Sequence, residues 1–343
     1  MRIYSHPRGR LLPSIALGIG ALTIVWPSNA FAHVKWFSAF DVAAAPRSLT
    51  SVLSPAFGGL FLISLVALWA ACLIERTAVG SALVETLDRI CALVRPGQER
   101  LLRAFGGAFF VSLWVLGNVI ITPELKTQSP MIPWLQLGIA VGLFWRPTMI
   151  LSGLGIVALY VIGVANYGIF HLLDYPIFLG LAGFFIASGL DVNPLGLRPI
   201  DIARWGAGLT LMWASIEKWA YPDWTYPLLA AHPRLAFGWD APLYMVAAGI
   251  IEFALAFGLI WTRMVRRLSS LVLLGMFISA ILEFGKIDAI GHSMIIAILI
   301  AVLADGGQKS VLRPLWAPIF YACALAIYLG LYYGLHVVLF GAA

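Results

Sequence analysis

Two short segments, WLQLGIAVGLFW at residues 134–145 and IIEFALAFGLIW at residues 250–261, decide the fold. They align without a gap, so that Gln136 falls opposite Glu252. Each is apolar along almost its whole length, which predicts a helix with apolar surroundings on every side, as in a membrane. The alignment further predicts that the chain contains one membrane unit twice.

The repeat extends on both sides of these segments. Trp114 precedes the sequence Thr-Pro-Glu at 122–124, and Trp213 precedes Tyr-Pro-Asp at 221–223, with the same offset in both cases. Each copy holds four apolar runs, and an even number brings both copies into the membrane from the same side. We therefore expect two parallel four-helix bundles, at 103–190 and 204–305.

Composition places the whole chain in a membrane. Hydrophobic residues make up 61% of the sequence and charged residues 11%, whereas soluble domains carry roughly 25% charged residues. The net charge of +6 is dispersed between apolar runs, which excludes a basic nucleic-acid surface. We expect an all-α polytopic membrane protein whose main partner is the lipid bilayer. Ten runs near the length of a bilayer span lie at 53–75, 104–121, 131–146, 148–166, 175–190, 204–220, 242–262, 267–284, 290–304 and 315–340.

The N-terminus predicts which side the chain starts on. Residues 1–32 combine three arginines, an apolar run and Ala30-Phe31-Ala32, the pattern of a signal peptide. Cleavage would leave His33 as the first mature residue, outside the cytoplasm; an uncleaved anchor helix is the alternative. On this topology 13 of the later basic residues lie inside and six outside, as the positive-inside rule requires. We expect a multi-pass protein of the bacterial inner (cytoplasmic) membrane with an extracytoplasmic mature N-terminus.

Two further segments complete the domain plan. Residues 33–102 hold the extracytoplasmic N-terminus, the first transmembrane helix and, at 77–103, a helix with charges on one side. That pattern predicts an amphipathic helix on the cytoplasmic membrane surface. Residues 306–343 hold the last transmembrane helix.

The second repeat resembles a known family. RWGAGLTLMWASIEKWAYPDW at 204–224 and the segment that follows the next loop are similar to the DoxX/DoxD-like group of four-helix membrane proteins. The resemblance covers about 100 of 343 residues, and the first repeat departs from it, with Gln136 in place of the glutamate. It implies a four-helix bundle that assists membrane redox reactions, passing electrons to quinone beside a soluble partner. The residues that carry the resemblance are Arg204, Gly206, Gly208, Lys218, Gly249, Glu252, Thr262 and Arg263.

Three ionisable residues in the second repeat are candidate catalytic residues, because charges inside a bilayer face a bundle interior by default. Glu252 lies nine residues before Trp261, roughly 13 Å along a helix, and is predicted to be a lone carboxylate near mid-membrane. It suits a proton relay or a bond to quinone; a structural hydrogen bond is the alternative. Glu217 is expected to face inward, toward Lys286 or His292. Lys218 either joins this site or anchors in an aromatic belt.

The outer turns supply the other candidates. EFGKIDAIGHS at 283–293 and NYGIFHLLDYP at 166–176 bring ionisable side chains to the same face, where they form either one pocket or two solvated loops. With the amine and imidazole of His33, they would suit copper or zinc. The candidate metal ligands are His33, His171, Asp174, Asp288 and His292; the candidate quinone-binding residues are Gln136, Trp219, Trp224 and Glu283.

Three functions follow from these patterns. The first is a DoxX-like redox accessory or quinone-linked oxidoreductase subunit, with an extracytoplasmic or cytoplasmic redox partner protein. The second is a proton-coupled or metal-ion transporter or metal-handling protein. The third is a non-catalytic membrane scaffold. Nucleotide-binding, hydrolase and metalloprotease motifs are missing from the sequence.

Overall fold

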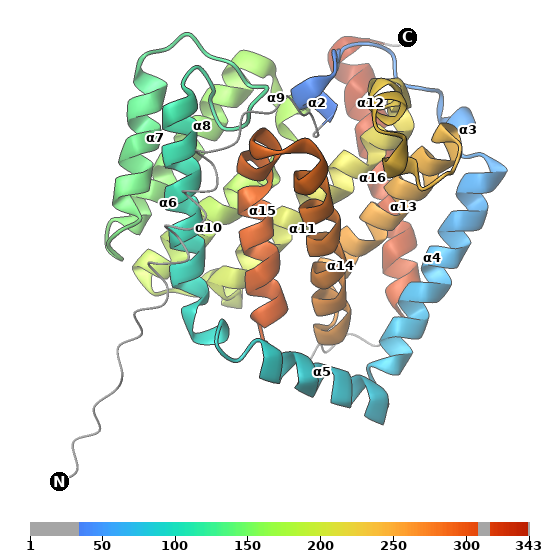
Figure 1. Ribbon diagram of the computed structural model, residues 1–343, viewed down its shortest axis with the longest axis horizontal. Helices are drawn as coiled ribbons and strands as arrows, with labels where there is room; N and C mark the ends of the chain where they lie inside the picture. Colours follow the sequence, from blue (N-terminus) through green and yellow to red (C-terminus); the bar gives the residue numbers. More distant parts are fainter. Residues whose placement is uncertain (1–33, 308–315, 342–343) are drawn as a thin grey trace.

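The computed structural model describes residues 34–307 and 316–341; the predicted signal peptide and His33 lie outside these residues. In this part of the chain every element is a helix (Figure 1). The α-helices are α2 (Val34–Phe37), α3 (Leu49–Val52), α4 (Pro55–Ile74), α5 (Ala78–Ile90), α6 (Gln98–Leu116), α7 (Met131–Gly142), α8 (Met149–Tyr167), α9 (Ile169–Leu172), α10 (Pro176–Leu190), α11 (Pro199–Ala220), α12 (Tyr226–Ala231), α13 (Ala241–Leu259), α14 (Arg263–Phe284), α15 (Lys286–Ala304) and α16 (Ala317–Phe340). Short 3₁₀ helices occupy Arg95–Gly97, Pro194–Gly196, Pro222–Trp224 and Pro233–Ala236.

Six of these helices are long and apolar enough to cross a membrane: α4, α8, α13, α14, α15 and α16. Helices α7 and α10 are also apolar but shorter, while α6 and α11 carry charged side chains. The chain is therefore an all-helical, multi-pass membrane protein. The finer expectation of ten crossings stays a prediction.

Local sequence fixes where several helices begin and end. The Ser54 side chain accepts a hydrogen bond from the Phe57 amide at the start of α4, and Asp240 caps α13 in the same way through the Leu243 amide. Such caps satisfy amides that the first helical turn leaves unpaired. Gly285 has a φ of +78°, a conformation that favours glycine, and it turns the chain from α14 directly into α15.

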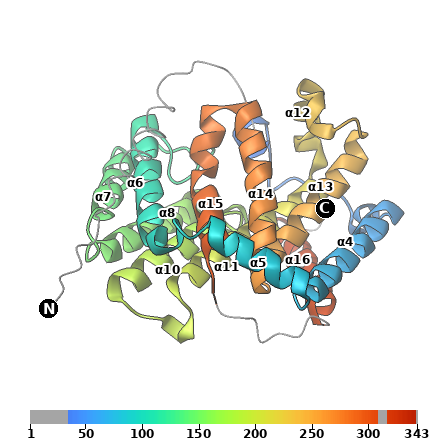
Figure 2. The ribbon, with the colours of Figure 1, turned by 60° about the horizontal axis from the view of Figure 1, so that its bottom comes forward.

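The central helices form two units of four. Helices α6, α7, α8 and α10 pack one against the next, and α11, α13, α14 and α15 do the same. We call these the first and second unit. They meet where α10 packs against α11 and where α15 packs against α6, while α4 and α16 pack on the second unit (Figures 1 and 2).

The same close contact joins the second and third helices of each unit. A side chain at Gly142 of α7 would collide with the Ser152 hydroxyl of α8, and one at Gly258 of α13 with the Ser269 hydroxyl of α14. Gly142 and Gly258 are aligned positions of the two segments that opened the sequence analysis. Both hairpins therefore need glycine for the same steric reason.

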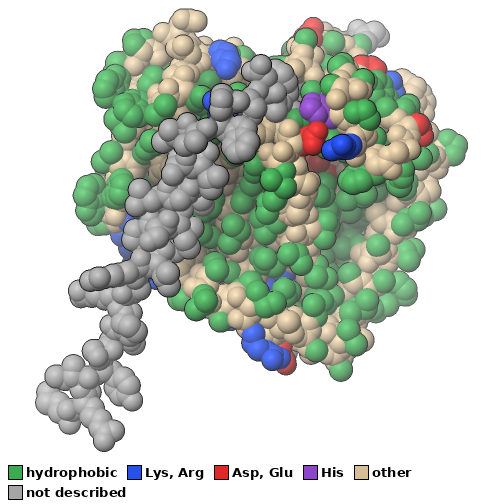
Figure 3. Space-filling view, in the orientation of Figure 1, with side chains coloured by type: hydrophobic (Ala, Val, Ile, Leu, Met, Phe, Trp, Pro, Cys, Tyr) green, Lys and Arg blue, Asp and Glu red, His purple; other side chains and the backbone are tan. Residues whose placement is uncertain are grey.

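The two ends of the molecule differ. Helix α5 runs across one end, and α2, α9 and α12 gather at the other (Figure 1). Asp88 of α5 accepts hydrogen bonds from Arg263 and Arg267 of α14. On the face seen in Figure 3, the exposed side chains between the two ends are mostly hydrophobic. The predicted amphipathic segment at 77–103 thus holds α5 and also the first turns of α6.

Candidate functional site

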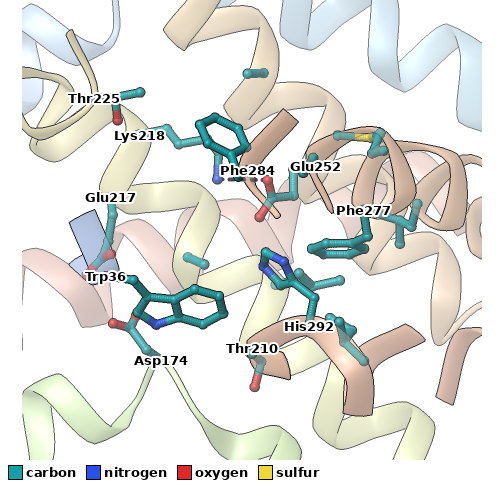
Figure 4. A pocket seen from close by; sticks show the side chains of 18 of the residues that line it. Trp36, Asp174, Thr210, Glu217, Lys218, Thr225, Glu252, Phe277, Phe284 and His292 are labelled. Atoms are coloured by element: carbon teal, nitrogen blue, oxygen red, sulfur yellow. Dashed lines mark ion pairs between the residues drawn. The ribbon is translucent and has the colours of Figure 1, made fainter. Parts of the chain in front are cut away.

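A pocket of about 360 Å³ opens among the helices of the second unit, toward the end that carries α2 and α12. Its wall is mostly apolar and aromatic, and five ionisable side chains reach into it from four different segments (Figure 4). A concave apolar site with a few convergent polar groups is the usual form of a small-molecule site. These five side chains belong to Asp174, Glu217, Lys218, Glu252 and His292.

Glu252 and Lys218 form an ion pair across the pocket. The Lys218 ammonium of α11 lies 2.7 Å from a carboxylate oxygen of Glu252 on α13, and both side chains are largely buried. The sequence predicted a lone carboxylate at Glu252, and that part of the prediction is wrong. The reason is tertiary: α11 packs against α13, and this packing brings the lysine to the carboxylate.

A second ionic cluster lies at the end of the pocket next to α2. The Lys35 ammonium of α2 donates hydrogen bonds to Glu217, at 2.6 Å, and to Asp174. The ring centroids of Phe40 and Trp224 lie 5.8 and 5.6 Å from the same ammonium, close enough for cation–π attraction. The expected partners of Glu217, Lys286 or His292, are therefore replaced by Lys35, which stands 182 residues away in the sequence.

The Trp36 side chain closes the pocket beside this cluster. Its ring occupies the space that a side chain at Gly291 would need, and its centroid lies 4.9 Å from that of His292. The Phe277 ring lies on His292 as well, at 4.7 Å. Figure 4 shows His292 facing the same space as Glu252. The short helix α2 thus supplies both a charge and an aromatic wall.

The predicted quinone-binding residues separate in the structure. Trp224 lines the pocket and stacks on Tyr221 at 4.2 Å. Trp219 lies outside the lining, where its indole donates to the Val246 carbonyl and packs on Phe57 of α4. Glu283 pairs with His232 at 2.8 Å, outside the pocket lining. Gln136 belongs to the first unit, where its amide donates to the carbonyls of Val119 and Ile120.

Of the predicted metal ligands that the structure describes, Asp288 and His292 form a pair. Within residues 34–307 and 316–341, no group of three or more His, Cys, Asp or Glu side chains is placed to hold a metal ion. His171 packs among the rings of Phe40, Tyr167 and Tyr175. Burial, aided by the Lys35 charge, lowers the pKa of this imidazole to about 3. Asp288 is fully buried and lies 3.0 Å from the His292 imidazole; His33 is outside the described residues.

We compared the chain with known protein families, curated proteins and solved structures. No protein-family model, no curated protein and no solved structure matches the chain. The resemblance of residues 204–304 to the DoxX/DoxD-like group therefore stays a prediction from the sequence.

Proposed function

We propose that this protein is a DoxX-like redox accessory of the bacterial cytoplasmic membrane that binds a quinone in the pocket of its second unit. The observation that carries the proposal is the Lys218–Glu252 pair, which presents an ammonium and a carboxyl group from the wall of a mostly apolar pocket. Ionisable groups at membrane depth mark functional sites by default.

A quinone suits the chemistry of this wall. Its ring is flat and apolar with two carbonyl oxygens, and a Lys218 ammonium can donate to one of them. The rings of Trp36, Phe277 and Phe284 offer flat apolar surfaces, and the volume of about 360 Å³ lies in the range of small-molecule sites. Reduction to quinol takes two electrons, which a redox partner protein would supply, and two protons.

The proposal includes the predicted topology. Ten helices would cross the bilayer. Eight of them, α6, α7, α8, α10, α11, α13, α14 and α15, would form two parallel copies of one four-helix plan, with α4 and α16 beside them. The matched contacts of Gly142 with Ser152 and of Gly258 with Ser269 support the repeat. Arginines such as Arg263 and Arg267 meet α5 at one end, which supports a cytoplasmic position for that end.

A binding titration tests this function. Trp36 and Trp224 line the pocket, so a water-soluble short-chain quinone should quench tryptophan fluorescence of the detergent-purified protein saturably. Glu252→Gln should weaken binding by roughly 10- to 150-fold, because a hydrogen bond with a charged partner contributes about 1.5–3 kcal/mol. Glu283→Gln is the matched control, since Glu283 lies on α14 outside the pocket lining. Equal affinity in wild type and Glu252→Gln would contradict the proposal.

Proton-coupled transport is the second candidate, favoured by one observation. Charged side chains follow the pocket wall from Asp174 and Glu217 to Lys218 and Glu252, an arrangement suited to passing protons. In proteoliposomes with an internal pH indicator, the internal pH should then change when a pH gradient is imposed across the membrane. Glu217→Gln should abolish this change. A signal equal to that of empty liposomes would contradict transport.

A further inference from the structure

The cluster at the end of the pocket next to α2 holds two carboxyl groups and one ammonium group. Lys35 contacts both Asp174 and Glu217, so the two carboxyl groups converge on one ammonium group. The side chains are 1%, 3% and 12% exposed, in the order Lys35, Asp174, Glu217. If all three were ionised, the cluster would carry a net charge of −1 with almost no access to water.

Neighbouring groups do not cancel that charge. Lys218 lies close enough to attract both carboxylates, but it is already paired with Glu252. Burial lowers the pKa of His171, so this imidazole is neutral. Within the described residues, the other titratable groups that interact with the cluster are an acid and four phenols, and none of these is a cation: Glu124, Tyr160, Tyr175, Tyr221 and Tyr332. An uncompensated charge at such a buried site is strongly unfavourable.

One further atom points to a missing proton. The second carboxyl oxygen of Asp174, Oδ1, is fully buried and has no hydrogen-bond partner among the residues that the structure describes, although Asp174 and Glu217 both line the pocket (Figure 4). Buried polar atoms are almost always hydrogen-bonded. A proton between the two carboxyl groups would give one of them a donor and would make the cluster neutral.

We propose that Asp174 and Glu217 share one proton beside the Lys35 ammonium, and that this cluster is a proton-exchange site of the pocket. Two carboxyl groups held close together share a proton because both cannot ionise at little cost. Burial raises the pKa of Asp174, with the Lys35 charge acting in the opposite direction. Burial alone would lower the pKa of Lys35, but the carboxylates of Asp174 and Glu217 outweigh it and hold that pKa above its usual value.

The role of this proton rests on the proposed function. For each electron that a bound quinone receives from a redox partner, the O–H bond of the shared carboxyl breaks and an O–H bond to one quinone oxygen forms. Two such steps, with the cluster reprotonated between them, supply the two protons of the quinol. The carboxylate left behind stays paired with Lys35, and a proton from the extracytoplasmic water restores the cluster. Both carboxyl groups line the space that the quinone would occupy.

Infrared spectroscopy of the quinone-free, full-length protein tests the proton directly. A protonated carboxyl group absorbs apart from a carboxylate and shifts in D₂O. The spectrum of wild type minus Asp174→Asn should show the loss of one protonated carboxyl, and so should wild type minus Glu217→Gln. Asp223→Asn is the control, because the Asp223 side chain is 70% exposed and should lose only carboxylate absorption.

Two results would overturn the proposal. One is that both variants lose only carboxylate absorption, which would mean an ionised cluster. The other is that neither variant folds, since each amide copies the protonated carboxyl that the proposal holds to be present. The fluorescence titration separates this inference from the quinone hypothesis. A shared proton without quinone binding would support the proton-exchange site and contradict the quinone hypothesis. Quinone binding without a shared proton would support the quinone hypothesis and contradict the proton-exchange site.

Discussion

Gln136 and Glu252 occupy aligned positions in the two units but bind different kinds of partner. Gln136 is fully buried in the first unit, and its amide closes the turn after α6 by donating to the Val119 and Ile120 carbonyls at 2.8 and 2.9 Å. Glu252 pairs with Lys218 at 2.7 Å and lines the pocket of the second unit. An amide satisfies fixed backbone groups, whereas a carboxyl group carries a charge and can exchange a proton.

A second pair of residues, each directly after the last helix of its unit, shows the same contrast. Asp191 follows α10, the last helix of the first unit, and pairs with Arg146 with its side chain 83% exposed. Asp305 follows α15, the last helix of the second unit, with its side chain 7% exposed, and it binds both Arg198 and Arg266. In both of these pairs the buried charge belongs to the second unit.

The largest effect is expected from placing the second unit's residue in the first. Gln136→Glu removes two amide donors and sets a buried carboxyl against two carbonyl oxygens. The expected loss is about 3–5 kcal/mol of stability, increasing as pH rises because the carboxyl must then ionise. Thermal unfolding in detergent at several pH values would measure it. Unchanged melting would show that the turn after α6 does not depend on the amide.

Asp305→Asn should have the next largest effect. Its carboxylate accepts hydrogen bonds from Arg198 at 2.8 and 2.9 Å and from Arg266 at 3.0 Å, so the loss is about 2–3 kcal/mol. Burial alone would raise the pKa of Asp305, but Arg198 and Arg266 outweigh the effect of burial and lower this pKa below its usual value. The stabilisation is therefore present above the usual pKa of an aspartate and is lost as pH falls through the depressed value. Melting curves of wild type and variant should converge in acid; a constant gap would contradict this account.

Glu252→Gln should change stability less than either substitution. Lys218 keeps 27% of its side chain exposed, so the ammonium can turn toward water when its partner loses charge. We expect a loss of about 1 kcal/mol, together with the weaker quinone binding described above. Circular dichroism melting beside the titration separates the two quantities. A collapse of the fold would assign Glu252 a structural role like that of Gln136.

Asp191→Asn should have the smallest effect. The pair with Arg146 is exposed on both sides, and surface pairs contribute about 0–1 kcal/mol. The melting temperature should stay within about 1–2 °C of wild type. A loss as large as that of Asp305→Asn would remove the contrast between the two units.

The sequence predicts the helices well because apolar runs and helix signals are local. The runs at 131–146 and 175–190 contain α7 and α10, and the turn at Gly285 follows from its residue type. Boundaries moved where polar residues continue a helix, as at the start of α6, which begins at Gln98. The alignment of Gln136 with Glu252 likewise needs only the order of residues.

The ionic partners of the site are harder to predict, because they depend on contacts between distant segments. Lys35 stands 139 residues from Asp174 and 182 from Glu217, and no periodicity links them. Lys218 is surrounded in the sequence by aromatic residues, a pattern typical of an interfacial belt. The sequence therefore does not indicate its contact with Glu252. Matching each intramembrane lysine to a nearby carboxylate is the signal that could have narrowed the choice.

Native mass spectrometry of the protein purified from quinone-containing membranes in mild detergent tests the central claim most directly. We predict a wild-type chain that carries the added mass of one quinone, and a Glu252→Gln chain from which that mass is mostly lost. A wild-type chain without a quinone, or equal occupancy in both proteins, would contradict the claim that the Lys218–Glu252 pocket is a quinone site.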